Sequence, residues 1–149
     1  MPLWGELFLF VLVVPPMWFI VSGLTALLGG WRELASNYAV PWGAGGMRLP
    51  FSSISLHTGL LPATYRRCVT VQLRADGFGL SAPFLAVHPP LHIPWSAVRE
   101  CREGGIIWRY VEVALKRPDT RIRLYGRARS AVHQQWLSVR TAPAPLTRR

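Results

Sequence analysis

The stretch LFLFVLVVPPMWFIVSGLTALL, at residues 7–28, contains no charged side chain. A helix rises about 1.5 Å per residue and the hydrocarbon core of a bilayer is roughly 30 Å thick, so the stretch is long enough to cross a membrane once. Trp4 and Trp31 flank it, where an amphipathic indole ring favours the headgroup region. The sequence therefore predicts a single transmembrane anchor within residues 1–31.

A cleaved signal peptide is the alternative interpretation of this stretch. Such a peptide begins with a positively charged segment, has an apolar run of about 7 to 15 residues and ends at a small-residue cleavage site. Residues 1–6 contain no Lys or Arg, the apolar run is longer, and it ends in LLGGW rather than in an A-x-A site. These features favour a retained anchor.

Two prolines interrupt the middle of the predicted helix. Pro15 and Pro16 remove two backbone donors and disfavour helical geometry at the preceding residues, so we expect a kink at this point. Small residues follow, and Ser22, Gly23 and Ala26 would allow a second helix to approach closely. The helix is therefore either a kinked anchor without a partner or a docking element for another membrane protein.

The positions of the basic residues predict the orientation. All 17 Lys and Arg residues follow Trp31, and Arg32 and Arg48 are the nearest to the helix. Loops rich in Lys and Arg stay in the cytoplasm, so we expect the N-terminus outside and the rest of the chain cytoplasmic, at the cell inner membrane. Cys68 and Cys101 are the two cysteines, and we expect both to remain thiols in a reducing cytosol.

Residues 32–50 predict a short helix followed by a linker. The segment WRELASNYAVP places Leu34, Ala35 and Tyr38 on one side before a proline ends the pattern. Residues 41–50 are rich in glycine, which is typical of a flexible hinge between membrane and domain.

From residue 51 the apolar pattern becomes that of β-strands. Residues 68–74 alternate, Asp76 and Gly77 supply turn chemistry, and residues 78–82 return, which predicts a β-hairpin. β-Branched and aromatic residues predict further strands at 54–57, 91–93, 106–115 and 120–125.

The chain ends with a predicted helix and a tail. Within residues 130–140, Ser130 is a candidate N-cap, and Val132, Trp136 and Val139 recur at helical spacing. Residues 141–149 have the composition of a disordered tail.

Several strands closed by one helix imply a small α+β domain at residues 51–140, with the helix over an open end or face of the sheet. This order of elements, together with HPPLHIPWSAV at residues 88–98, resembles uncharacterised bacterial membrane-anchored proteins that carry a pleckstrin-homology-like domain. The resemblance covers residues 31–140. It implies an open barrel or sheet with a C-terminal helix, in a class whose members bind lipids, peptides or other proteins.

The sequence contains no pattern that indicates catalysis. His88 and His92 are four residues apart, but Pro89 and Pro90 exclude a helix that would place both rings on one face. There is no C-x-x-C motif, no G-x-S-x-G elbow and no phosphate-binding loop. We therefore expect neither an enzyme nor a metal or cofactor site.

Basic charge is the stronger functional feature, since the chain has a net charge of +10 and its acidic residues are few. Each arginine beside an anionic cytoplasmic leaflet contributes about 1 kcal/mol to binding. A solvated basic surface is the alternative, and nucleic acid is disfavoured because no reader motif is present. The candidate contacts with anionic lipid headgroups are Arg66, Arg67, Arg121, Arg123, Arg127 and Arg129.

Together these patterns predict a non-enzymatic, membrane-anchored binding or scaffolding module with a basic cytoplasmic domain. The alternative is an accessory subunit of a larger membrane complex, docked through the kinked transmembrane helix.

Overall fold

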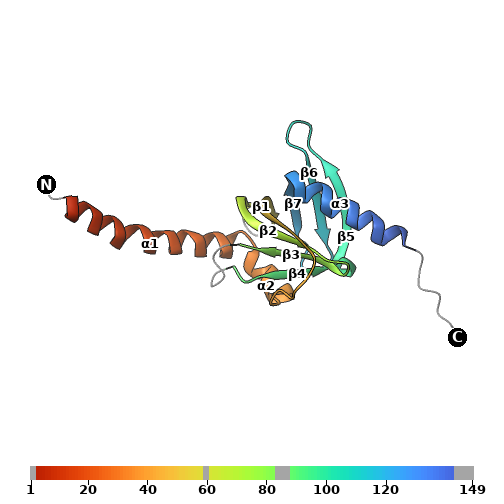
Figure 1. The fold of residues 1–149 in the computed structure, drawn as a ribbon, viewed down its shortest axis with the longest axis horizontal. Coiled ribbons are helices and arrows are strands. Elements are labelled where there is room, and N and C mark those ends of the chain that lie inside the picture. Colours follow the sequence, from red (N-terminus) through yellow and green to blue (C-terminus); the bar gives the residue numbers. More distant parts are fainter. Residues whose placement is uncertain (1–2, 59–60, 83–87, 143–149) are drawn as a thin grey trace.

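The structure is a computed structural model that describes residues 3–58, 61–82 and 88–142 (Figure 1). An apolar N-terminal helix leads into a small α+β domain, which contains a curled antiparallel sheet and a C-terminal helix. The coarse fold predicted from the sequence is therefore confirmed.

The first helix, α1, spans Leu3–Leu28 and extends away from the domain (Figure 1). It continues without a break through Pro15 and Pro16. Its segment Trp4–Leu24 is long and apolar enough to cross a membrane, and none of that segment is buried. A signal sequence can have the same length and hydropathy.

A sharp corner joins α1 to the second helix, α2, which spans Trp31–Tyr38. The N-cap residue Gly30 has φ = 84°, a left-handed conformation that glycine adopts without steric cost. Trp31 and Leu34 are fully buried in the domain core. The predicted headgroup position of Trp31 is therefore wrong, because its ring is covered by protein.

Seven strands form one sheet, in which every neighbouring pair is antiparallel and the order is β4-β3-β2-β1-β7-β6-β5. The central strand β1 therefore joins the β2–β4 side of the sheet to the β5–β7 side. The strands are β1 (Met47–His57), β2 (Ala63–Leu73), β3 (Gly77–Ser81), β4 (Leu91–Pro94), β5 (Val98–Gly104), β6 (Tyr110–Leu115) and β7 (Arg121–Tyr125), with a 3-10 turn at Trp95–Ala97.

The predicted flexible linker at residues 41–50 is wrong over much of its length. Met47 already belongs to β1 and pairs with Leu73. The indole Nε1 of Trp42 donates to the Leu91 carbonyl oxygen at 3.2 Å, and Gln72 Nε2 donates to the Gly43 carbonyl oxygen at 3.3 Å. These hydrogen bonds tie the segment to the sheet, so the ordered domain begins well before residue 51.

The predicted hairpin of residues 68–82 is confirmed as β2 and β3, closed by a hydrogen bond from the Arg74 amide to the Gly77 carbonyl oxygen at 2.9 Å. Two other strands differ from what the sequence predicted. Strand β5 was not predicted, and the strand predicted at 106–115 begins only at Tyr110 because residues 106–109 form the turn between β5 and β6.

The last helix, α3, spans Gly126–Thr141 and starts earlier than predicted, with Tyr125 at the N-cap position instead of Ser130. Ala128, Val132 and Trp136 recur every four residues and are buried. Of the predicted tail, residues 141 and 142 end the described part, and 143–149 lie outside it.

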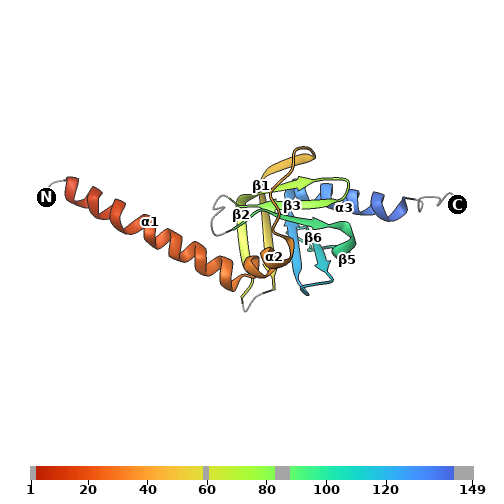
Figure 2. The ribbon, with the colours of Figure 1, turned by 90° about the horizontal axis from the view of Figure 1, so that it is seen from below.

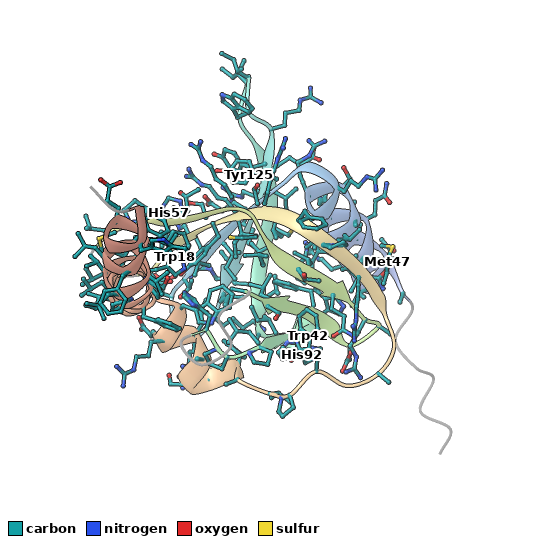
Figure 3. The ribbon with its side chains drawn as sticks, turned by 60° about the vertical axis from the view of Figure 1, so that its left-hand side comes forward. Trp18, Trp42, Met47, His57, His92 and Tyr125 are labelled. Atoms are coloured by element: carbon teal, nitrogen blue, oxygen red, sulfur yellow. The ribbon has the colours of Figure 1, made fainter. Side chains whose placement is uncertain are left out.

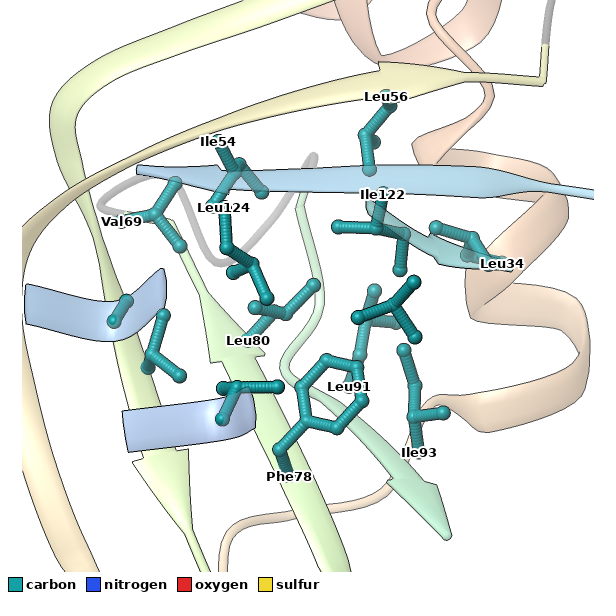
Figure 4. Close-up of a cluster of buried hydrophobic side chains, with 14 of the residues drawn as sticks. Leu34, Ile54, Leu56, Val69, Phe78, Leu80, Leu91, Ile93, Ile122 and Leu124 are labelled. Carbon is teal, nitrogen blue, oxygen red and sulfur yellow. The ribbon is translucent and has the colours of Figure 1, made fainter. Parts of the chain in front are cut away.

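The core lies inside the curl of the sheet (Figures 2 and 4). It combines Leu34 of α2 with side chains of every strand and of α3. Register shifts between β1 and β2 around Ser52 bend the two long strands, with Phe51 and Arg67 at positive φ. Such bulges increase the local twist and allow one sheet to surround its own core.

Candidate binding surface

Strand register brings four segments together where the β5–β7 side of the sheet meets the bulge of β1 and β2. Tyr110 pairs with both Gly104 and Tyr125, and at the next position Leu124 pairs with Ile54. Beside Ile54, the Ser53 Oγ accepts a hydrogen bond from the Arg67 amide at 3.0 Å. We call this part of the domain, residues 51–53, 66–68, 104–110 and 125–129, the hairpin end.

Three large apolar side chains protrude from the hairpin end. Ile106, Ile107 and Trp108 are 97%, 86% and 80% exposed, at the turn between β5 and β6. Gly105 has φ = +84°, and a Cβ on it would lie 2.1 Å from the Trp108 carbonyl oxygen. The turn is therefore tight and requires glycine. We call residues 105–109 the hairpin tip.

Aromatic and cationic side chains brace the base of the hairpin tip. The rings of Tyr110 and Tyr125 make an edge contact, with centroids 6.0 Å apart. The Arg123 guanidinium lies over the Tyr110 ring, 4.6 Å from its centroid. Figure 3 shows Tyr125 at the foot of the projecting hairpin, whose side chains extend into open space.

The structure divides the six predicted lipid-contact arginines into two groups. Arg123 Nε donates to Glu112 Oε2 at 2.9 Å, and Arg121 Nη1 lies 3.9 Å from Glu112 Oε1. The hydrogen bond to Glu112 raises the pKa of Arg123. Because one carboxylate already neutralises part of this pair, its attraction for an anionic ligand is reduced.

The other four arginines belong to the hairpin end. Arg66 and Arg67 are exposed on the bulge of β2, and Arg127 and Arg129 are on the first turns of α3. Within the described residues, none of the four forms an ion pair. Of the carboxylates on β5 and β6, Glu103 lies 3.3 Å from His133 Nδ1 and Glu112 lies 2.9 Å from Arg123 Nε. The hairpin end is therefore strongly basic.

A buried aromatic cluster fixes the α1–α2 corner to the sheet. The rings of Trp31, Tyr65 and His88 make mutual edge contacts, with centroids 5.1 to 5.4 Å apart. Trp31 Nε1 donates to the Pro89 carbonyl oxygen at 3.1 Å, and the Tyr65 hydroxyl lies 3.2 Å from His88 Nε2. Burial raises the pKa of Tyr65 to about 12 and lowers that of His88. The cluster thus consists of uncharged groups.

The candidate helix-docking residues lie near the C-terminal end of α1. Ser22 and Gly23 are half-buried, and a Cβ added at Gly23 would meet no atom within 4 Å. The surface at Gly23 is thus open to a second helix. The side chain of Ala26 lies outside the described residues.

The remaining polar groups do not assemble into a reactive site. Among the described residues, no group of three His, Cys, Asp or Glu side chains is arranged to hold a metal ion. Burial, with a smaller contribution from Glu103, raises the pKa of the half-buried Cys101 to about 12, so this thiol stays protonated at neutral pH. His92 Nε2 lies 3.3 Å from Asp76 Oδ2, a pairing across a strand turn that the sequence did not indicate.

An open hollow lies between the β2–β3 turn and α3, beside the start of β1. Its polar lining includes Arg74, Asp76, Gln134, Gln135 and Ser138. Arg74 and Asp76 already form an ion pair at 3.3 Å. The hollow therefore offers little unpaired charge to a ligand, unlike the hairpin end.

Comparisons with known proteins identify no family for this chain. No family model matches it, and no curated protein matches it. Among solved structures, the chain is similar to the C-terminal domain of an unknown protein from Leishmania infantum, at 12% identity and a TM-score of 0.42, over 78% of this chain and 98% of that domain.

Sequence reasoning missed the hairpin tip, although its signal is present. Gly104 and Gly105 directly precede IIWR, and adjacent glycines are a turn signal. The β-branched and aromatic residues that follow were interpreted as strand because they carry high strand propensity.

Proposed function

We propose that this protein is a single-pass, membrane-anchored binding module whose domain lies in the cytoplasm. One observation carries the proposal: an exposed apolar helix of membrane-spanning length ends in a corner that is buried in the domain core. With Trp31 and Leu34 in that core, the domain is held at a defined orientation to α1. A flexible tether would give the domain no such orientation.

The pleckstrin-homology-like assignment belongs to this proposal. It is supported by seven antiparallel strands that curl around a core and by a C-terminal helix that packs against them. Domains of this shape serve as binding modules, so the assignment agrees with a scaffolding role.

Anionic lipid headgroups are the proposed ligands of the basic surface. The arginines without an ion pair in the described chain, Arg66, Arg67, Arg127 and Arg129, are better candidates than Arg121 and Arg123, which share Glu112. Each contributes about 1 kcal/mol if it reaches the headgroups.

An accessory subunit of a larger membrane complex is the second candidate function. The open surface at Gly23 and the exposed hairpin tip favour it, because both are suited to contact with another protein.

Purification in mild detergent followed by mass spectrometry distinguishes the two functions. A subunit should retain a fixed set of membrane proteins in constant ratio, and a Gly23→Leu variant should lose them if α1 is the docking element. A binding module should be recovered from the membrane fraction without such a set. Recovery of the full chain in the soluble fraction would contradict both functions.

A further inference from the structure

The hairpin tip is the least covered apolar feature of the domain. Ile106, Ile107 and Trp108 are adjacent, and they are more exposed than the other large apolar side chains in the described part of the domain. An exposed apolar cluster rimmed by polar residues marks an interaction site. The tight glycine turn and the braced tyrosines fix the shape of this cluster before binding, which lowers the entropic cost of association.

The direction of the hairpin indicates what kind of molecule it meets. Figure 1 shows the β5–β6 hairpin projecting transversely to the long axis of α1. If α1 spans the bilayer, the tip points along the plane of the membrane. Transmembrane helices tilt by about 20° on average and by up to about 40°, which is too little to turn a transverse hairpin into the bilayer. The geometry therefore favours a neighbouring protein over lipid.

The chemistry of the tip agrees with a protein contact. Trp108, Arg109 and Tyr110 are consecutive, and Trp, Arg and Tyr are the residue types enriched in interface hot spots. Arg109 supplies a positive charge in the tip itself, and Glu112, near the base of the hairpin, already pairs with Arg123. A complementary surface would be apolar at its centre and carry carboxylates at its rim.

We propose that the hairpin tip inserts into an apolar cleft bordered by carboxylates on the cytoplasmic part of a neighbouring membrane protein. Trp108 and Ile107 fill the cleft, and Arg109 pairs with a carboxylate at its rim. This inference rests on the proposed function, since the tip lies in the plane of the membrane only if α1 spans it.

Site-specific photo-crosslinking in native membranes tests the proposal with the full chain. A photoreactive phenylalanine analogue replaces Ile107, and in a matched control it replaces Leu137, an apolar residue of α3 that is 47% exposed. We expect position 107 to form an adduct with an integral membrane protein. Mass spectrometry should place the crosslink in an apolar segment next to Asp or Glu, and position 137 should not form this adduct.

Two further variants test the stated chemistry. Trp108→Ala and Arg109→Glu, each combined with the crosslinker at 107, should lower the adduct yield on the order of tenfold, as expected for loss of a hot-spot contact. Changing the mapped partner carboxylate to Lys should restore the adduct of Arg109→Glu. Failure of that rescue would overturn the assigned charge pairing.

Other outcomes contradict the inference in distinguishable ways. A phospholipid adduct at position 107 would show that the tip meets the bilayer, and an adduct with a second copy of this chain would show self-association. If the chain is in the membrane fraction and position 107 forms no adduct, the inference is wrong and the proposed function is unaffected. Absence of the chain from that fraction would overturn the proposed function as well.

Discussion

Trp31 and Trp108 occupy opposite environments in the same small protein. Trp31, at the corner after α1, is fully buried and donates a hydrogen bond to the Pro89 carbonyl oxygen, whereas Trp108, at the hairpin tip, is 80% exposed. The sequence predicted the reverse, with Trp31 at the membrane surface and Trp108 within a strand. We therefore expect the buried corner to contribute to the stability of the domain, and we propose the exposed hairpin tip as the place where the domain binds a partner.

The largest expected effect is on stability, at the corner. Replacing Trp31 with Ala removes a large buried side chain, which costs about 3 to 5 kcal/mol. Trp108→Ala should change the free energy of unfolding by less than about 0.5 kcal/mol, because its ring contacts mainly solvent. Chemical denaturation of the detergent-solubilised chain measures both. Equal losses from the two substitutions would invalidate the comparison.

Trp136 tests whether α3 stabilises the domain as strongly as the corner does. Its ring is 8% exposed and lies 6.2 Å from that of Trp95, so Trp136→Ala should cost about 3 kcal/mol, near the lower limit for a buried Trp. The same denaturation experiment checks this, with Leu137→Ala as the exposed neighbour. An unchanged melting temperature for Trp136→Ala would show that α3 does not close the core.

A smaller effect is expected from the hydrogen bond between Tyr65 and His88. Tyr65→Phe leaves His88 Nε2 without its 3.2 Å partner, which should cost about 1 kcal/mol. The measurement is the free energy of unfolding near neutral pH. A loss as large as that of Trp31→Ala would mean that the hydroxyl, rather than ring packing, holds the corner.

The corner should also weaken in acid. Burial lowers the pKa of His88 below its ordinary value of 6.5, so the unfolded chain binds a proton that the folded chain does not. Stability is then fully present above about pH 6.5 and falls as the pH drops from there toward the folded-state pKa. Burial is also the main reason that the pKa of His57 is lowered, so His57 likewise makes stability fall as the pH drops. Unfolding of wild type and His88→Gln between about pH 7.5 and pH 5 checks this. Identical pH profiles would exclude His88 as the cause.

The smallest effect on stability, within about 0.5 kcal/mol, is expected for the exposed pair Arg66→Gln and Arg67→Gln. In nanodiscs that contain anionic lipid, however, this variant should lose protection of the backbone amides of 66–68 from hydrogen exchange. Protection in wild type should fade with salt, because such charges are screened within about 8 Å at physiological ionic strength. The matched control, Arg121→Gln with Arg123→Gln, should retain it. Equal protection in neutral nanodiscs would refute a lipid contact.

The sequence predicts the apolar helix, the β2–β3 hairpin and the buried positions Val132 and Trp136 of α3 because each has a strong local pattern, whereas Val139 of the same pattern is exposed. It does not predict β5, because the charged residues Arg99, Glu100, Arg102 and Glu103 resemble a solvated loop. In the structure β5 is an edge strand, and charges of this kind protect an edge strand from pairing with other chains. It also misplaces the start of β6, because the strand propensity of Ile106 and Ile107 outweighed the two turn glycines before them.

The errors at the corner and in the binding surface have a different origin, which is long-range contact. The pattern of Leu34, Ala35 and Tyr38 indicated an amphipathic helix, but not that the sheet covers Trp31. Likewise Arg121 and Arg123 were both predicted to contact lipid, while the carboxylate that lies between them comes from the neighbouring strand. Only the strand order reveals that Arg66, Arg67 and Arg127 belong to the same end of the domain.

The topology of the chain decides whether the corner and the hairpin tip lie at a membrane. The corner and the hairpin tip have the roles assigned to them only if α1 spans the membrane and the domain remains in the cytoplasm. Reporters fused after Arg149 measure this, one that functions only in the cytoplasm and one that functions only in the periplasm. We expect activity of the cytoplasmic reporter in the membrane fraction. Activity of the periplasmic reporter, or release of the cytoplasmic fusion into the soluble fraction, would contradict it.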